Sequence, residues 1–423
     1  MNLIKKVEKM SRILVYKTID IKNKSNYKTM ANTFYERFGG VCPNFGNKLW
    51  YQGIISEVST EDNEIIYYTD SFTTDYINNN FDILLYPMAN IFSIEFSKGL
   101  IPITSFIKNL KIPVYIISCG VQANNYDDLE NLVYTIGNVS KEFIKAVYNS
   151  GGDFALRGYF TAEFFKRLGF NDLNVVGCPS IFQCGPSIKI TKKDVLFKDF
   201  KVAVNGKAEI ALPVLKEYKS IFYDQEQLFN ILYNNIFYSS VNAGIKGNIQ
   251  WLKSSGFGFY FNDLILNDRI RLLADMWDWQ HSLQNEGVCF SFGTRIHGNV
   301  MSILSGIPAL IVNVDMRVKE MAEFYDIPNI EYSDVVNNLD TKNYIYKLYK
   351  KLDYTTFNKK FLEKYNAFND FMVKKGIVKK LNTNNPYLNC SDGCYPKSAI
   401  VNAKKRANLI KKHKTMYSLL LKY

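Results

Sequence analysis

The sequence predicts an α/β protein with two domains, each built on a parallel sheet. Its 423 residues exceed what a single hydrophobic core commonly supports. Short apolar runs that end at Gly, Asn or Pro alternate with longer helical patterns, as strands and helices alternate in βαβ units. Residues 288–317 contain one such unit in full: a buried strand, a tight turn, a helix that stops at Gly-Ile-Pro, and a second buried strand.

The first predicted domain covers residues 1–188. Apolar runs indicate its strands, and a Gly/Asn/Pro loop at residues 39–47 leads into a helical pattern. Strands are expected at residues 12–20, 81–86 and 114–120, and helices at residues 128–135, 140–148 and 161–168. Turn clusters at Cys178 and Cys184, followed by a charged stretch at residues 189–200, indicate the domain boundary.

The second predicted domain covers residues 189–377. A strand is expected at residues 201–205, and a strand–helix series continues through residues 269–280 to the unit at 288–317. Residues 333–377 read as helices rich in Tyr, Phe and Lys. Residues 378–423 form a basic C-terminal extension.

The net charge of +12 is concentrated at the C-terminus. Residues 397–423 hold eight Lys or Arg and no Asp or Glu, so the rest of the chain carries only +4. Their apolar positions form one face of an amphipathic helix, which either lies on an anionic membrane surface or packs on its own domain. Because the charge lies at one end, without an interleaved aromatic platform, nucleic-acid binding is not predicted.

The chain has the features of a cytoplasmic protein, free or at the inner face of the membrane. No secretory signal is visible at the N-terminus, and no apolar run reaches the ~20 residues of a spanning helix. Cys119, Cys178 and Cys289 lie in or beside apolar runs, as buried thiols do. Cys390 and Cys394 have no second pair of matching spacing, so no metal site is predicted.

Two charged clusters follow the two strands of the unit at residues 288–317. Arg295 and His297 come after the first strand, and Asp315 and Arg317 come after the second. In open α/β sheets, ligands bind outside the carboxyl ends of the strands. Both clusters are therefore expected at a ligand site.

The run Gly-Thr-Arg-Ile-His-Gly-Asn at residues 293–299, with Gly-Ile-Pro at 306–308, Asp315, Arg317 and Glu320, resembles the polysaccharide pyruvyl transferase family. Weaker resemblances lie at residues 44–47 and 154–180. Asn47 stands where the family has an acidic residue, and residues 86–90 replace a Gly-rich turn. Both departures concern the identity of the acceptor more than the donor.

The resemblance implies two Rossmann-like domains that face each other across a cleft, as in GT-B glycosyltransferases. It also implies transfer of a pyruvyl group from phosphoenolpyruvate to two hydroxyls of a sugar or lipid-linked oligosaccharide, with formation of a cyclic ketal. The acceptor is expected on the N-terminal domain and the pyruvyl donor on the C-terminal domain. Neither a metal nor a nucleotide cofactor is expected.

The pyruvyl donor carries a phosphate and a carboxylate, which arginine binds through paired hydrogen bonds. Arg157 and Arg295 are the candidates, one from each domain. Arg317 either binds phosphate or pairs with Asp315. Gly298 would permit close approach of the ligand, and Asn299 either binds an anion at the helix start or serves as a cap.

His297 is the candidate general acid that protonates the methylene carbon of the donor. Histidine is the side chain whose ordinary pKa lies near neutral pH, and a turn can direct His297 and Arg295 to one ligand. Its alternative role is a bond to the backbone at the helix start. Asn44 and Asn47 either bind acceptor hydroxyls or order a turn. Aromatic residues, at 15% of the chain, are mostly expected in the core, and none is assigned to a sugar.

Two other functions compete with pyruvyl transfer. A nucleotide-sugar glycosyltransferase on the same fold would need a pyrophosphate-binding Gly-rich loop and a carboxylate for the ribose. No such loop is clear in the second domain, although Asp315 and Glu320 could supply the carboxylate. A non-catalytic protein of surface-polysaccharide assembly, held at a membrane by residues 397–423, is the other alternative.

Overall fold

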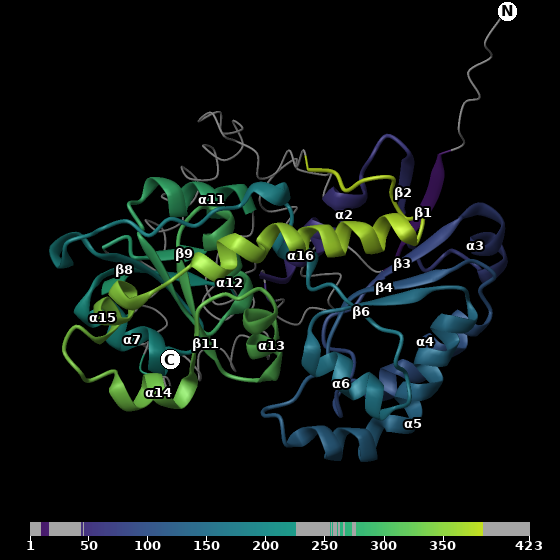
Figure 1. Ribbon diagram of the computed structural model, residues 1–423, viewed down its shortest axis with the longest axis horizontal. Coiled ribbons are helices and arrows are strands. Elements are labelled where there is room, and N and C mark those ends of the chain that lie inside the picture. The colour runs from purple at the N-terminus through teal and green to yellow at the C-terminus, as the bar shows by residue number, and fades with distance from the viewer. Residues whose placement is uncertain are drawn as a thin grey trace, which may run out of the picture.

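The computed structural model describes residues 10–16, 44, 46–225, 267–272 and 276–383, with positions 254, 256, 260, 263 and 264 (Figure 1). The predicted basic helix at residues 397–423 and most of the predicted loop at 39–47 lie outside the described residues. No helix among the residues described is both long and apolar enough to cross a membrane.

The N-terminal half of the chain forms a six-stranded, all-parallel sheet in the order β2-β1-β3-β4-β5-β6. After β1 the chain adds β2 on one side of it, and then crosses over to add β3 and the later strands on the other side. The topological switch point of the sheet therefore lies between β1 and β3. The strands are β1 (Ser11–Val15), β2 (Asn63–Tyr67), β3 (Ile83–Pro87), β4 (Val114–Cys119), β5 (Asp153–Leu156) and β6 (Asn174–Val175).

The C-terminal half forms a second six-stranded parallel sheet, in the order β12-β11-β10-β7-β8-β9. Its switch point lies between β7 and β10. The strands are β7 (Lys201–Asn205), β8 (Lys219–Asp224), β9 (Ile270–Leu272), β10 (Phe290–Gly293), β11 (Ala309–Asn313) and β12 (Asn329–Glu331). Two parallel sheets with helices on their faces confirm the predicted α/β fold with two Rossmann-like domains.

Helices cover both faces of the first sheet because alternate strand residues point to opposite sides. Leu14, Leu84 and Ile116 pack in one cluster, which α3 (Thr74–Asn80), α4 (Ser97–Lys108), α5 (Asp128–Asn149) and α6 (Tyr159–Arg167) complete. Ile13 and Ile117 face the other side, toward α2 (Gly46–Val58). The two helical patterns predicted at residues 128–135 and 140–148 are one continuous helix, α5, whose apolar stripe keeps its period across the polar break.

The second sheet is covered in the same way. One face packs against α7 (Ala208–Glu217), α14 (Tyr332–Asn338) and α15 (Tyr344–Lys351). The other faces α11 (Met276–Asn285), α12 (Ile296–Leu304) and α13 (Met316–Phe324). The 3-10 turns η1 (Pro179–Ile181), η2 (Gly185–Ser187) and η3 (Phe197–Asp199) lie along the connection between the sheets.

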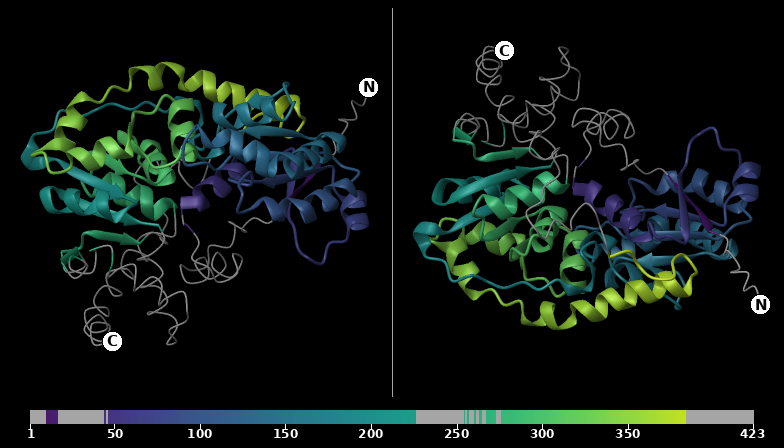
Figure 2. Two further views of the ribbon diagram at one scale, coloured as in Figure 1. Left: turned by 90° about the horizontal axis from the view of Figure 1, so that it is seen from below. Right: turned by 90° about the horizontal axis from the view of Figure 1, so that it is seen from above.

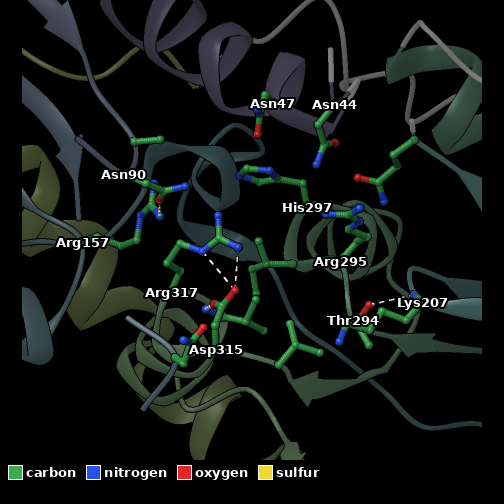
Figure 3. Close-up of a pocket in the computed structure, with 16 residues that line it drawn as sticks. Asn44, Asn47, Asn90, Arg157, Lys207, Thr294, Arg295, His297, Asp315 and Arg317 are labelled. Atoms are coloured by element: carbon green, nitrogen blue, oxygen red, sulfur yellow. Dashed lines mark hydrogen bonds and ion pairs between the residues drawn. The ribbon is translucent and has the colours of Figure 1, made fainter. Parts of the chain in front are cut away.

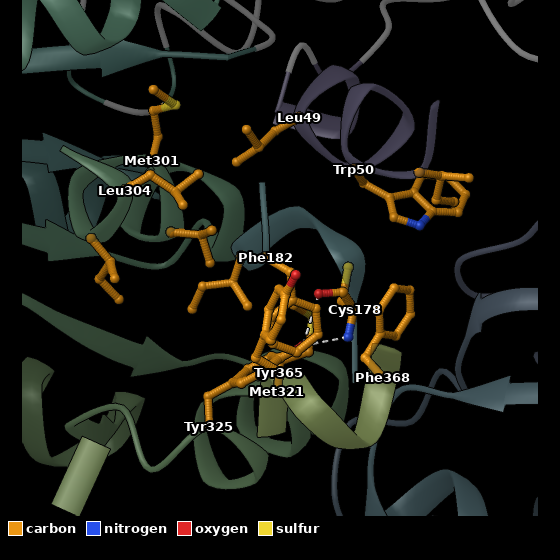
Figure 4. Packing of buried hydrophobic residues seen from close by; sticks show 14 of the residues in the cluster. Leu49, Trp50, Cys178, Phe182, Met301, Leu304, Met321, Tyr325, Tyr365 and Phe368 are labelled. Atoms are coloured by element: carbon orange, nitrogen blue, oxygen red, sulfur yellow. Dashed lines mark hydrogen bonds between the residues drawn. The ribbon is translucent and has the colours of Figure 1, made fainter. Parts of the chain in front are cut away.

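One apolar cluster continues from the first sheet to the second. It includes Leu49 and Trp50 of α2, Met301 of α12, Tyr325 beyond α13, and Phe368 of α16 (Thr355–Lys374) (Figure 4). Helix α16 spans both halves of the molecule, and α2 lies between them (Figure 2). The two sheets therefore share a core and are held in a fixed relative position by buried apolar contacts.

The chain returns to the first sheet after α16. The Lys375 ammonium lies 2.6 Å from the Asp153 carboxylate, and the carbonyl of Ile377 accepts a hydrogen bond from Asn63. Residues 375–382 thus contact the amino ends of β5 and β2, although they lie at the far end of the described chain.

Candidate active site

A cavity of about 320 Å³ lies where the switch points of the two sheets face each other (Figure 3). Side chains from both halves of the chain line it, including seven that the sequence singled out: Asn44, Asn47, Arg157, Arg295, His297, Asp315 and Arg317. Within the described residues, its ionised side chains are four cations (Arg157, Lys207, Arg295 and Arg317) and one carboxylate (Asp315). The cavity is small and suits an anion.

His297 is the second residue of α12, and its side chain lies at the centre of the pocket (Figure 3). The residue is 7% exposed, and no described group makes a hydrogen bond to its Nε2 atom. Burial, with the charges of Arg157 and Arg317, lowers the pKa of the imidazole to about 3. The lowered pKa favours a neutral ring at neutral pH, which differs from the pKa near neutral pH that the sequence led us to expect.

Arg157 follows β5 and is 4% exposed. Its Nη1 donates to the Asn90 side chain at 2.9 Å, and its Nη2 donates to the carbonyl of Ser118 at 3.2 Å. Its Nε has no hydrogen-bond partner among the described residues. These two bonds fix the guanidinium plane at the wall of the pocket and use two of its five N–H groups, so hydrogen-bonding capacity remains on this side chain.

The backbone at the end of β4 is shaped around Arg157. Ser118 has φ +65°, which is rare for a residue other than glycine, and the pairing of β4 with β5 shifts register at this point. Such a conformation costs on the order of 1–3 kcal/mol and is often found at functional sites. Here it accompanies the hydrogen bond from Arg157 to the Ser118 carbonyl.

Arg317 pairs with Asp315 and also lines the pocket. The Arg317 Nη2 and Nε atoms lie 2.5 and 3.1 Å from Asp315 Oδ2, while Asp315 Oδ1 accepts from the Val318 amide and caps α13. Arg317 therefore forms the ion pair with Asp315 that was one of its two predicted roles. Because its side chain is 31% exposed and faces the cavity, the pair leaves part of the guanidinium accessible.

Gly298 and Asn299, which were predicted near the donor, are not among the residues that line the cavity. Asn299 is fully buried: it donates to the carbonyls of Gly293 and Arg295 and accepts from Ser291. It lies one turn inside α12 and faces the sheet. A Cβ at Gly298 would lie 2.4 Å from the Gln225 amide, so this glycine admits a neighbouring side chain.

Asn205, at the end of β7, organises the turn that carries Arg295. Its Oδ1 accepts from the Arg295 amide at 2.9 Å, and the Thr294 hydroxyl accepts from the Lys207 amide at 3.0 Å. These contacts bring Lys207 and Arg295 to the same wall. Sequence reasoning missed Asn205 and Lys207, although both stand at the end of a predicted strand, where ligands bind in such sheets.

The start of α2 closes the pocket from the N-terminal half. Asn44 accepts from the Gly46 amide at 2.9 Å and orders the turn before the helix, as one of its predicted roles requires. A Cβ at Gly46 would lie 3.0 Å from the His297 Cβ and 2.1 Å from the Gln225 side chain. Gln225 is 3% exposed, and neither atom of its amide has a partner among the described residues. No motif or pattern in the sequence pointed to Gln225.

A second cavity, of about 890 Å³, adjoins the first along the N-terminal sheet. The two share Asn47, Ala89 and Asn90. Aromatic side chains dominate the larger one, together with Thr69 and Asp70, and we call it the aromatic hollow. Its aromatic residues are Trp50, Tyr51, Tyr68, Tyr86 and Phe96. It contains no cation among the described residues, so it differs in chemistry from the first cavity.

The comparison with protein families decides the affiliation of the chain. A model of the family described as polysaccharide pyruvyl transferase matches residues 44–316, which include the walls of the pocket contributed by both sheets. The chain belongs to the polysaccharide pyruvyl transferase family. The matched region contains the run at residues 293–299, Gly-Ile-Pro at 306–308 and Asp315, on which the resemblance mainly rested, and it ends just before Arg317.

Solved structures with a similar arrangement include a UDP-N-acetylglucosamine 2-epimerase, with 9% identity, a TM-score of 0.37, and coverage of 88% of this chain and 98% of that one. A putative UDP-N-acetylglucosamine 2-epimerase from Listeria monocytogenes has 8% identity and a TM-score of 0.38, with coverage of 87% and 98%. None of the curated proteins matches this chain.

Proposed function

We propose that this protein transfers a pyruvyl group from phosphoenolpyruvate to a sugar of a cell-surface polysaccharide or its precursor, with formation of a pyruvate ketal. The observation that carries the proposal is the neutral His297 ring among cationic side chains from both sheets. The cavity volume of about 320 Å³ is near the lower end of the range for small-molecule sites. A small donor with a phosphate and a carboxylate fits this combination of size and charge.

The arginines hold the donor in this proposal. Planar guanidinium groups bind phosphate and carboxylate oxygens through parallel hydrogen bonds. Arg157, with an unpartnered Nε, approaches from the N-terminal sheet, and Arg295 approaches from the C-terminal sheet. Arg317 contributes the accessible part of its guanidinium. The residues present offer the positive charge that binding needs without a metal ion.

The donor itself prepares His297 for acid catalysis. Two neighbouring arginine charges and burial disfavour the protonated ring in the empty pocket. The negative charges of a bound donor oppose those arginine charges, so donor binding raises the pKa of His297 and brings a proton to the ring. The imidazolium then protonates the methylene carbon, which leaves an oxocarbenium ion at the neighbouring carbon.

Two acceptor hydroxyls complete the reaction. The first attacks the oxocarbenium carbon and loses its proton, which restores the imidazolium. The second displaces the phosphate from the same carbon, and its proton leaves with the phosphate. One carbon–hydrogen and two carbon–oxygen bonds form, the bond from carbon to the phosphate oxygen breaks, and the enol π bond is consumed.

The aromatic hollow is the place we propose for the acceptor. Sugar rings present C–H faces that pack on aromatic rings, and their hydroxyls suit amide and carboxylate partners. Asn47 and Asn90 stand where the hollow meets the cation-lined cavity. A sugar in the hollow can therefore direct hydroxyls toward the donor carbon from the N-terminal side.

A nucleotide-sugar glycosyltransferase receives less support from the same pocket. Such an enzyme needs a carboxylate for the ribose hydroxyls. Asp315 is engaged by Arg317 and by the cap of α13, and Glu320 is buried against α6. Asp315 and Glu320 are therefore both engaged in other hydrogen bonds, and neither carboxylate is available to bind ribose hydroxyls.

Phosphate release tests the proposal. Incubation with phosphoenolpyruvate and glycan acceptors should yield inorganic phosphate and a glycan that carries a ketal. Thermal shift should show stabilisation by phosphoenolpyruvate and none by a panel of nucleotide sugars. Stabilisation by a nucleotide sugar alone would favour the glycosyltransferase, and a fully functional His297→Ala variant in cells would favour a non-catalytic role.

A further inference from the structure

We propose that Glu320 is a positioning residue that holds Arg157 in place from the opposite domain. Glu320 lies on α13, beside the second sheet, whereas Arg157 follows a strand of the first sheet. The contact between them runs through Thr161 of α6. The inference rests on the proposed function in one respect only, the use of phosphoenolpyruvate as the ligand of Arg157.

Glu320 supplies the N-terminal cap that α6 lacks. The N-cap residue of α6 is Gly158, which has no side chain to accept a hydrogen bond. The Thr161 amide is the third in the helix, the position that a capping side chain usually satisfies. Instead, this amide donates to Glu320 Oε2 at 2.6 Å, and the Thr161 hydroxyl donates to Oε1 at 2.9 Å. The capping carboxylate thus comes from the other domain.

The fit between α13 and α6 is too close for any residue but glycine at position 158. A Cβ there would lie 2.2 Å from the Glu320 Cγ. Gly158 directly follows Arg157 in the chain, so Glu320 packs against the residue next to Arg157. Thr161 is fully buried and Glu320 is 3% exposed, so water does not share these bonds.

The same contact organises the loop after β4. The Thr161 hydroxyl accepts from the Val121 amide at 3.0 Å, and the Met316 amide at the start of α13 donates to the carbonyl of Ala123 at 3.0 Å. This loop continues from Ser118, whose carbonyl receives Arg157. Helix α13 therefore fixes α6 and the β4 loop together, and Arg157 is held between these two segments.

Charge adds to the geometry. Burial raises the pKa of Glu320 to about 7, while the Thr161 bonds and the Arg157 charge act in the opposite direction. The exposed Glu323 is the other charged group that acts on it. Loss of the carboxylate charge would weaken the cap and remove a counter-charge of Arg157.

Binding of phosphoenolpyruvate without acceptor, measured by equilibrium dialysis, tests the role of Glu320. We expect Glu320→Gln to raise the Kd roughly tenfold or more, since hydrogen bonds to a charged group are lost. Glu323→Gln, an exposed position on the same helix, is the matched control and should leave the Kd unchanged. Equal Kd values for the wild type and Glu320→Gln would overturn the inference.

A double-mutant cycle separates positioning from a general structural effect. If Glu320 acts through Arg157, Glu320→Gln should change the Kd by less than about twofold in an Arg157→Lys background. Additive effects would contradict the proposal. Should Glu320→Gln fail to fold, Gly158→Ala takes its place, because the added methyl displaces the Glu320 side chain and should weaken binding in the same way.

Hydrogen exchange tests the contact itself, whatever the ligand. In Glu320→Gln the Thr161 amide should exchange faster than in the wild type, and in Glu323→Gln it should not. Unchanged protection of Thr161 would contradict the cap. A wild-type protein that shows this protection pattern but binds no phosphoenolpyruvate would contradict the proposed function and leave the cap supported.

Discussion

At the residue scale, the pocket places a neutral imidazole beside guanidinium groups that disfavour its protonation. Sequence reasoning expected His297 to titrate near neutral pH, but burial and the charges of Arg157 and Arg317 lower its pKa to about 3. A ligand with negative charge beside the ring would oppose the arginine charges and raise the pKa of His297. In the proposed mechanism, the acid therefore forms only together with the bound donor.

Replacement of His297 by asparagine should abolish catalysis and preserve binding. General acid catalysis contributes about 10²–10⁴-fold to rate, so we expect a loss of phosphate release of that size. The Kd for phosphoenolpyruvate should change only slightly, since the arginines remain. Steady-state phosphate release and a binding titration measure the two effects. His281→Asn, on α11, is the control, and near-normal turnover in His297→Asn would exclude its role as the acid.

At the scale of elements, the site is assembled by strand ends and helix starts that the sequence partly revealed. The strands predicted at residues 114–120 and 201–205 and the unit at 288–317 are present in the structure, because the short length of these apolar runs and the turn residues at their ends favour a strand over a helix. Gln225 was not singled out, and Glu320 was singled out without its contact to Thr161, because both positions depend on contacts between the two domains. No local pattern carries that information.

Two substitutions in the aromatic hollow should affect the acceptor alone. Tyr68→Ala removes an aromatic side chain from the hollow, and Asp70→Asn removes a negative charge from it. Neither residue lines the cation-lined cavity. We expect the KM for the acceptor to rise by about three- to tenfold in Tyr68→Ala, the range of a single aromatic contact. The KM for phosphoenolpyruvate should stay constant.

Initial rates at varied acceptor and fixed donor measure this effect. Tyr134→Ala, 91% exposed on α5 and outside the hollow, is the matched control. A rise in the KM for phosphoenolpyruvate with an unchanged KM for the acceptor would reverse the proposed assignment of the two cavities.

At the scale of the whole molecule, the shared core holds the two domains together and contains one unpaired acid. Glu57 of α2 is 1% exposed, and neither carboxylate oxygen has a hydrogen-bond partner among the described residues. Burial, with a smaller effect of Cys178, raises its pKa well above the ordinary value. The folded protein therefore keeps this carboxyl protonated under conditions in which the unfolded chain ionises it.

Glu57→Gln should make the protein relatively more stable as the pH rises. Because the folded state binds the proton more tightly, wild-type stability is greatest below the unfolded pKa and falls as pH rises toward the folded pKa. The difference in free energy of unfolding between variant and wild type should grow as the pH rises above the unfolded pKa of the carboxyl, by at most about 1.4 kcal/mol per pH unit, and level off above the folded pKa. Urea denaturation between pH 5 and pH 8 measures it, with the exposed Glu61→Gln as control. A difference that stays constant with pH would show that Glu57 is ionised in the fold.

Our central proposal is that cations from both domains bind one small donor. Calorimetric titration of the protein with phosphoenolpyruvate tests this proposal most directly. The wild type should bind one equivalent. Arg157→Gln and Arg295→Gln, one from each sheet, should each weaken binding by at least about tenfold, as expected for lost hydrogen bonds to a charged ligand. No binding by the wild type, or undiminished binding by either variant, would contradict the proposed donor site.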